Sequence, residues 1–196
     1  MPKSNFLTPS TFPALMSNGR NGKTLGDTAL AVVDQLVLDM LGTEPREEMT
    51  SAATEWGKEY EWAAIEIYQE KHMVRVNRPE FTVCPDLPYV GGTADGLVGR
   101  DLILEIKCPF NPLNHIAREK QLKNYMYQLQ GYMWIYNRPM LDFISFDDRF
   151  TDDLKLLADR VERDDAAISA LKERCELAYG MARERAEQVK KRYRAA

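Results

Sequence analysis

Hydrophobic residues recur at helical spacing in several stretches of the chain. In residues 24–42, for example, Leu30, Val33 and Val37 lie three or four positions apart, and a glycine ends the pattern. The same period predicts further helices over residues 51–70, 108–120, 121–136 and 152–192. Gly180 marks a point at which the last of these helices can kink. Both ends of the chain are therefore expected to be largely helical.

Between these helices, shorter apolar runs predict strands. The expected strands are two short ones between residues 74 and 84, then 89–98, 102–107 and 141–146. Gly99-Arg100-Asp101 is typical of a hairpin turn and would join 89–98 to 102–107. This order predicts an α/β fold in which a small sheet is flanked by helices. We expect one domain over residues 1–196, with a core at about 50–150 and a helical C-terminal extension at about 151–196.

The composition is that of an ordinary folded domain. The chain has 196 residues, of which 44% are hydrophobic and 29% charged, and no apolar run approaches the length of a membrane-spanning helix. The N-terminus lacks the apolar core of a secretory signal, so we expect a cytoplasmic protein without a membrane partner. Three scattered cysteines form neither a disulfide framework nor a CxxC metal motif.

The charge is unevenly distributed along the chain. The formal net charge is −4, which by itself argues mildly against a nucleic-acid partner. However, residues 24–70 contain eleven acidic residues and only two basic ones, whereas the first 23 residues contain three bases and no acid. The acidity therefore belongs to one stretch, and the average does not exclude a partner elsewhere on the surface.

The most informative segment is residues 91–109. In the predicted strand 102–107, side chains alternate, so Ile103, Glu105 and Lys107 share one face. If the hairpin turn centres on Arg100, Asp95 lies opposite Glu105. Two carboxylates at that range repel each other unless a cation lies between them.

A divalent cation with oxygen ligands, Mg²⁺ or Mn²⁺, would satisfy Asp95 and Glu105. Lys107 would then hold or help to deprotonate a water that attacks a metal-bound phosphate. The alternative is that Glu105 and Lys107 form an ordinary exposed pair on an amphipathic hairpin. The three glycines around Asp95 favour the first interpretation, because they let a bulky ligand approach the backbone.

Asp95 followed by Glu105-Ile106-Lys107 matches the PD-(D/E)xK nuclease pattern, although Ala94 replaces its proline. With the extension to Phe110, the sequence resembles the lambda-exonuclease-type, YqaJ-like phage recombination nucleases, from about residue 8 to residue 149. The resemblance implies a restriction-endonuclease-like core, a small mixed sheet flanked by helices, with added N- and C-terminal helices.

The resemblance extends to motifs near the N-terminus and in the second helix. Thr8-Pro9-Ser10 and the basic segment 19–23 match residues that contact the DNA end, which implies that Ser10, Arg20 and Lys3 bind its terminal phosphate. The alternative for Ser10 is a helix N-cap. The motif Trp56–Glu61 matches a helical glutamate that faces the metal, so Glu61 would hold a second ion directly or through water.

The remaining motifs place further residues near the phosphate. The resemblance assigns Thr93, beside Asp95, and Tyr132 to DNA binding. Gln128 would position the scissile or terminal phosphate, as in the glutamine motif of the family. Gln128 and Tyr132 also stand four positions apart on a helix and could pair with each other.

The implied function is a Mg²⁺-dependent 5′→3′ exonuclease that degrades one strand of linear double-stranded DNA with a 5′-phosphate and leaves 3′ single-stranded overhangs. Asp95, Glu105 and the Ile106 backbone carbonyl would bind one metal, with one or two ions per site and Mn²⁺ as a substitute. Lys107 and Gln128 would be catalytic, as would Glu61. The family also implies a homotrimeric ring, a phage single-strand annealing protein as partner, and a phage or prophage gene in a bacterial host.

Two alternatives remain open at this stage. One is a PD-(D/E)xK endonuclease of restriction or repair type, which would cut closed circular DNA. The other is a non-catalytic DNA-binding module on the same fold. The two histidines match none of the motifs: His115 could reach a phosphate, whereas His72 is expected to stabilise the end of a helix.

Overall fold

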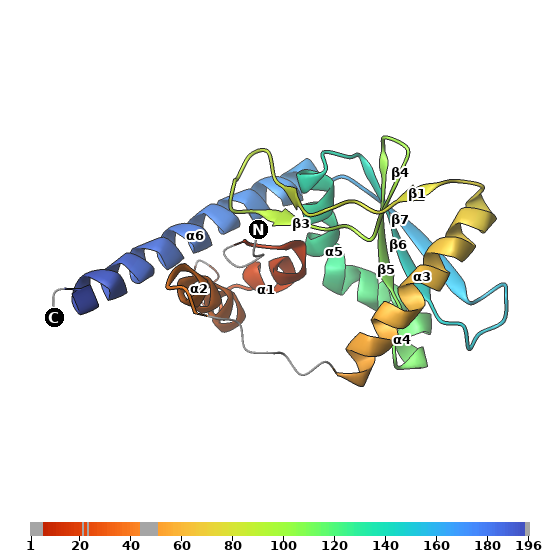
Figure 1. Cartoon of the computed structure of the whole chain (residues 1–196), viewed down its shortest axis with the longest axis horizontal. Helices are drawn as coiled ribbons and strands as arrows, with labels where there is room; N and C mark the ends of the chain where they lie inside the picture. The colour runs from red at the N-terminus through yellow and green to blue at the C-terminus, as the bar shows by residue number, and fades with distance from the viewer. Residues whose placement is uncertain (1–5, 21, 23, 44–50, 195–196) are drawn as a thin grey trace.

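The computed structural model describes residues 6–20, 22, 24–43 and 51–194 and contains a five-stranded mixed sheet (Figure 1). Its strands are, in spatial order, β1 (Val76–Asn77), β4 (Gly96–Val98), β5 (Leu102–Lys107), β6 (Met140–Phe146) and β7 (Leu156–Glu162). Only β5 and β6 are parallel; the other neighbours are antiparallel. A separate antiparallel pair joins β2 (Thr82–Val83) to β3 (Gly91–Gly92).

The hairpin between β4 and β5 has the register that the sequence predicts. Gly96 pairs with Leu104 and Val98 pairs with Leu102, across a turn in which Gly99 has a φ of 54°. A positive φ of this kind favours glycine, which explains the turn at this position. Continuing the register by one residue places Asp95 opposite Glu105.

Helices cover both faces of the sheet, so that β5 is buried between two layers (Figure 1). α3 (Ala52–His72) packs on the face that carries Leu104 and Ile106, and α5 (Arg118–Ile135) packs on the face that carries Ile103. Because side chains alternate along β5, Glu105 lies on the α5 side of the sheet. These two helices therefore decide which side chains surround the charged residues of the strand.

Local signals position the helices next to the sheet. The Ser51 hydroxyl accepts a hydrogen bond from the Thr54 amide at the start of α3, and Met73 ends the helix in the left-handed conformation. His72 is the last residue of α3, which confirms its expected place at a helix end. The short helix α4 (Pro112–Ile116) is capped by the Asn111 side chain.

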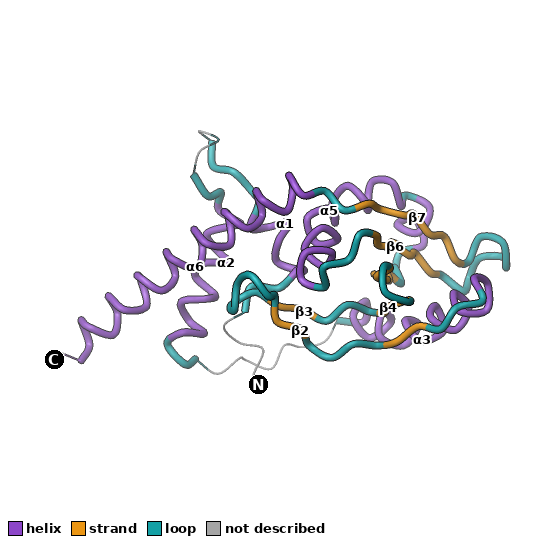
Figure 2. Tube along the Cα trace, turned by 90° about the horizontal axis from the view of Figure 1, so that it is seen from above, coloured by secondary structure: helices purple, strands orange, loops and turns teal. Residues whose placement is uncertain are grey.

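The N- and C-terminal helices build a second apolar core away from the sheet. The short helices η1 (Pro9–Thr11) and α1 (Phe12–Leu15) pack on α5. α2 (Asp27–Met40) packs across α6 (Asp165–Arg194), as Figures 1 and 2 both show. A bridge between Leu7 and Val90 ties the N-terminal segment to the region of β3. Among the described helices, none is long and apolar enough to span a membrane.

One expectation for the C-terminal region is wrong. Residues 152–192 were predicted to be helical, but Leu156–Glu162 form β7, which pairs along its whole length with β6. The sheet therefore continues past residue 150, and α6 begins only at Asp165. Without β7 the edge of β6 would leave unpaired backbone groups, and this pairing outweighs the helix propensity of the segment. Gly180 lies within α6 and does not end it.

Candidate active site

The structure brings the three residues of the predicted catalytic motif together at one end of β5. Asp95 accepts a hydrogen bond from the Ile106 amide, with 2.6 Å between Oδ2 and N. The Lys107 ammonium lies 2.6 Å from Oε1 of Glu105. The Gln128 amide donates to the same oxygen at 2.7 Å from the facing helix α5. Asp95 and Glu105, called here the carboxylate pair, are thus held by contacts from β5 and α5.

Glu105 is buried and Asp95 is partly buried beside it, which changes the pKa of both carboxylates and of Lys107. Burial, followed by the charge of Glu105, raises the pKa of Asp95 well above its ordinary value. Burial also raises the pKa of Glu105, although Lys107 opposes the shift. Burial lowers the pKa of Lys107, but the neighbouring carboxylates outweigh this effect and leave it raised. Ionisation of both carboxylates is therefore unfavourable unless a further cation is present, whereas the lysine stays protonated.

The carboxylate pair has the chemistry that a hard cation requires. Oε2 of Glu105 is buried and has no hydrogen-bond partner within the described part of the chain. Leaving such an oxygen without a partner costs about 1–3 kcal/mol. Residues 6–20, 22, 24–43 and 51–194 contain no cluster of three or more His, Cys, Asp or Glu side chains arranged to hold a metal. Mg²⁺ does not need one, since it commonly uses one or two carboxylates together with waters and substrate phosphates. The residues present fit a Mg²⁺ ion.

Glu61 lies on α3, on the opposite side of β5 from Gln128. Its charge contributes to the raised pKa of both members of the carboxylate pair. Its carboxylate forms an ion pair with Arg78, which also lies over the ring of Trp62. Sequence reasoning missed Arg78, because nothing in the sequence shows that the segment after β1 returns to α3. Glu61 is thus close enough to the carboxylate pair to affect its pKa values, while its own carboxylate is paired with Arg78.

A second set of predicted residues lines a pocket next to the carboxylate pair. This pocket, called here the end pocket, has a volume of about 270 Å³ and is lined by Thr8, Pro9, Ser10, Phe81, Gly92, Thr93 and Tyr132. The Tyr132 hydroxyl donates to the Thr93 carbonyl at 3.1 Å. A side chain at Gly92 would collide with Pro9, which explains the glycine. The structure therefore brings Ser10, Thr93 and Tyr132 together.

The other predictions for the N-terminal segment have mixed outcomes. Ser10 is not a helix N-cap: it lies inside η1, whose N-cap is Thr8, and its hydroxyl is 3.1 Å from that of Thr8. Arg20 is exposed in the turn between α1 and α2. Lys3 lies outside the described residues.

His115 does not reach a phosphate site, contrary to expectation. It is fully buried, with Nδ1 2.8 Å from the Ser145 hydroxyl and Nε2 2.9 Å from the Leu154 carbonyl. Both ring nitrogens are thus used to tie α4 to β6 and to the segment between β6 and β7. Its role is structural, because a ring with both nitrogens engaged has no free donor or acceptor for a ligand.

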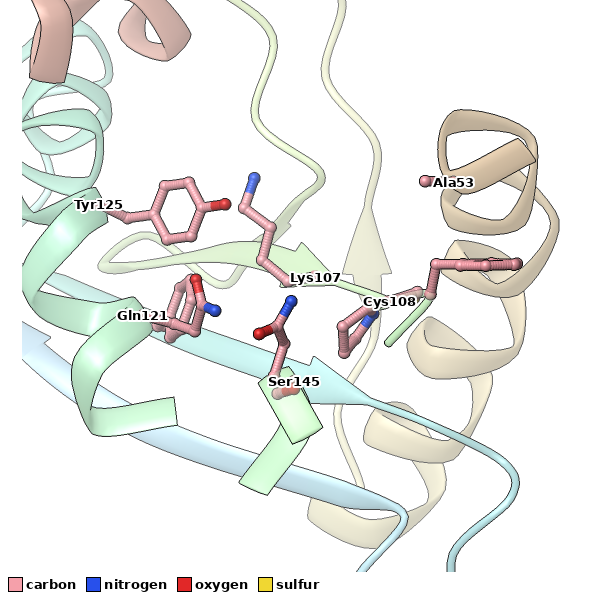
Figure 3. Close-up of a pocket in the computed structure, with 10 residues that line it drawn as sticks. Ala53, Lys107, Cys108, Gln121, Tyr125 and Ser145 are labelled. Carbon is pink, nitrogen blue, oxygen red and sulfur yellow. The ribbon is translucent and has the colours of Figure 1, made fainter. Parts of the chain in front are cut away.

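Two further residues support the site: Tyr125, which was not singled out from the sequence, and Arg149, which ends a weak family motif at residues 146–149. The Lys107 ammonium lies 4.7 Å from the ring centroid of Tyr125, and Figure 3 shows the two side chains next to each other. Arg149 pairs with Asp147 and donates to the carbonyls of Pro109 and Phe110, which fixes the segment that follows β5. The sequence does contain a signal for Tyr125, since it precedes Gln128 by one helical turn.

Comparison with known proteins places the chain in a family. Residues 8–139, more than half of the chain, match the YqaJ-like viral recombinase domain. An alkaline exonuclease (LHK-Exo) from Laribacter hongkongensis superimposes with a TM-score of 0.87 and 27% identity, and the match covers 98% of this chain and 95% of that one. The same exonuclease in complex with dAMP gives 28% identity over the same shares, again with a TM-score of 0.87.

A phage-related exonuclease from Haemophilus somnus 129PT has the same fold, with a TM-score of 0.78, 21% identity and coverage of 94% of this chain and 96% of that one. No curated protein is significantly similar in sequence. The mixed sheet between helices is thus the restriction-endonuclease-like fold that the sequence predicts. The chain belongs to the YqaJ-like viral recombinase domain family.

Proposed function

We propose that the protein is a Mg²⁺-dependent exonuclease that degrades one strand of linear double-stranded DNA from its 5′ end and leaves a 3′ single strand. The observation that carries this proposal is that the carboxylate pair and Lys107 meet at one end of β5, in a chain that superimposes on an alkaline exonuclease over nearly its whole length. That exonuclease has also been solved with dAMP, a deoxynucleoside monophosphate.

Asp95, Glu105 and the Ile106 carbonyl would hold the metal, and Glu61 would hold a second ion directly or through water. Bound Mg²⁺, or Mn²⁺ in its place, supplies Lewis-acid stabilisation of the phosphate and lowers the pKa of a bound water. The unpartnered Oε2 of Glu105 supports this assignment. Either one or two ions per site are compatible with these donors.

Lys107 and Gln128 would act on the substrate side of the site. Because the pKa of Lys107 is raised, its ammonium acts as a hydrogen-bond donor that orients the attacking water and the phosphate oxygens. Neutralisation of Glu105 by a cation would remove the largest cause of that raised pKa and bring the lysine closer to proton transfer. Gln128 fixes Glu105 through its amide and would position the phosphate beside it.

The end pocket is the proposed site for the 5′-phosphate. Ser10 and Thr93 contribute hydroxyl groups there, and Tyr132 holds the Thr93 backbone. Arg20 and Lys3 would add positive charge at the DNA end. A closed pocket beyond the catalytic groups would accept the end of a strand and exclude continuous duplex, which is what an exonuclease requires.

The family membership supports three further proposals about the setting. The protein would assemble as a homotrimeric ring around DNA, which would let it remain on the strand that it shortens. It would work with a phage single-strand annealing protein in recombination. It would be encoded by a phage or prophage and act in the cytoplasm of a bacterial cell.

End-labelled duplexes test the direction of digestion. With Mg²⁺ and a 5′-phosphorylated linear duplex, we expect the 5′ label to appear first as a mononucleotide while a 3′ label stays on long fragments. Early loss of the 3′ label would reverse the proposed polarity. Labelled internal fragments from the start of the reaction would indicate an endonuclease instead.

A further inference from the structure

A second cavity adjoins Lys107 on the side away from the end pocket. This cavity, called here the lysine cavity, has a volume of about 220 Å³ (Figure 3). Its lining is Ala53, Lys107, Cys108, Pro109, Phe110, Asn114, Gln121, Tyr125, Phe143 and Ser145. Pockets for drug-sized ligands usually have volumes of about 300–1,000 Å³, so the lysine cavity takes a smaller ligand, such as a single ring system.

The lining of the lysine cavity combines aromatic surfaces with side-chain amides. Tyr125 comes from α5 and the exposed ring of Phe110 from the segment after β5. Asn114 and Gln121 contribute amides, and neither side chain forms a hydrogen bond with another described residue. Lys107 is the only charged side chain in the described lining. Aromatic surfaces with free amides suit a flat heterocycle, whereas a phosphate would need more than one cation.

The order of residues along α5 relates this cavity to the rest of the site. α5 connects two parallel strands and therefore runs antiparallel to β5. Along it, Tyr132 lies at the end pocket, Gln128 contacts Glu105, Tyr125 contacts Lys107, and Gln121 lines the lysine cavity. A strand with its 5′-phosphate in the end pocket would pass the carboxylate pair and then reach the lysine cavity.

We propose that the lysine cavity binds the base of the second nucleotide, immediately 3′ of the phosphodiester bond that is cut. This inference rests on the proposed 5′→3′ activity. After each cut that base belongs to the new terminal nucleotide, so its contact with Tyr125 and Phe110 keeps the shortened strand attached. The stacking is with the π face and is therefore tolerant of sequence.

Photo-crosslinking in the absence of metal tests the location of the base without requiring cleavage. Linear 5′-phosphorylated duplexes carry 5-iodouracil at the first, second or sixth nucleotide, and the protein is irradiated with them in EDTA. We expect the second position to crosslink to Tyr125 or Phe110, identified by peptide mass spectrometry. Crosslinks from the second position only to residues outside the cavity, or no crosslink from it, would overturn the proposal.

Variants then test whether stacking holds the strand. Tyr125→Leu keeps an apolar side chain against Phe143 but removes the aromatic face, and we expect release of the first nucleotide to slow by about 5- to 100-fold. An abasic second nucleotide should slow the wild type by a similar factor and should not slow Tyr125→Leu further. Tyr125→Phe should recover both the rate and the sensitivity to the abasic site. Tyr193→Leu, which removes an exposed aromatic ring near the end of α6, is the matched control.

These outcomes separate the subsite from the proposed function. If no duplex is digested under any condition, the proposed exonuclease activity fails, and the crosslinking result still decides the base site. If digestion proceeds but an abasic second nucleotide has no effect on the wild type, the base site fails while the exonuclease activity stands.

Discussion

In the metal-free protein, the carboxylate pair lowers the free energy of unfolding when both carboxylates are ionised. Asp95 and Glu105 both have pKa values raised by burial, so folding favours their protonated forms. An acid with a raised pKa in the folded state stabilises the fold below its unfolded pKa, near 4, and loses that contribution as the pH rises through the folded pKa. A bound cation would reverse this balance, because it favours the ionised carboxylates.

We therefore predict that, in EDTA, the free energy of unfolding of the wild type falls as the pH rises from about 4 through the raised pKa values. Asp95→Asn should flatten this dependence, because it removes the carboxyl whose pKa burial and Glu105 raise, without changing the shape of the side chain. At neutral pH, Mg²⁺ should stabilise the wild type and not Asp95→Asn. Urea unfolding followed by circular dichroism measures all three; identical pH profiles for the two proteins would refute the explanation.

Residues in the site differ in how far the sequence could predict them. The sequence could predict the relative positions of Asp95, Glu105 and Lys107, because a hairpin turn and the two-residue period of strands determine them. His115 was not, since its partners, Ser145 and Leu154, lie 30 and 39 residues away and are set by the packing of α4 against the sheet. The same holds for Arg78, whose partner Glu61 is on another element.

At the level of elements, the glycine at position 131 controls how the N-terminal segment meets the sheet. Gly131 lies on α5, and a side chain there would overlap the ring of Phe12 in α1. The segment 8–12, with Ser10 in the end pocket, docks through this contact. A helical glycine without such a neighbour is Gly180, which has open space around the position of a side chain.

Alanine at these two glycines should therefore have opposite effects. Gly131→Ala is expected to destabilise the protein by about 1–3 kcal/mol through overpacking, although alanine favours a helix. Gly180→Ala should stabilise it by about 0.5–1 kcal/mol, because only the helix propensity changes. Chemical denaturation compares the pair directly. A stabilised Gly131→Ala protein would show that Phe12 does not pack against α5 as described.

The prediction of a helix where the structure has β7 is wrong for a reason that also lies in the packing of elements. Residues 156–162 contain leucine, alanine, arginine and glutamate, all good helix formers. As a strand, the segment completes the hydrogen bonds of β6 and places Arg160 in an ion pair with the buried Asp142. Asp142 also accepts a hydrogen bond from Tyr68 of α3. This residue of β6 therefore links the edge strand β7 to the helix α3. The helix propensity of the segment does not reveal these contacts with β6.

At the level of the whole molecule, the sheet lies toward one end of the structure and the α2–α6 pair toward the other (Figure 2). The candidate site lies with the sheet, between α3 and α5, and the N-terminal segment connects the two regions. The acidic stretch 24–70 includes much of α2 and α3 and supplies Glu61 to the site. The net charge of −4 is thus compatible with the proposed function, in which acidic side chains would hold a metal ion beside the DNA.

The central claim is that this centre cuts DNA from an end, with the carboxylate pair and Mg²⁺ required together. The most direct measurement compares closed circular duplex with the same plasmid after linearisation, for the wild type, Glu105→Gln and the exposed control Glu184→Gln. We predict that the wild type and Glu184→Gln digest only the linear form and only with Mg²⁺, and that Glu105→Gln is slower by about 100-fold or more. Cleavage of the closed circle, or full activity of Glu105→Gln, would contradict the account.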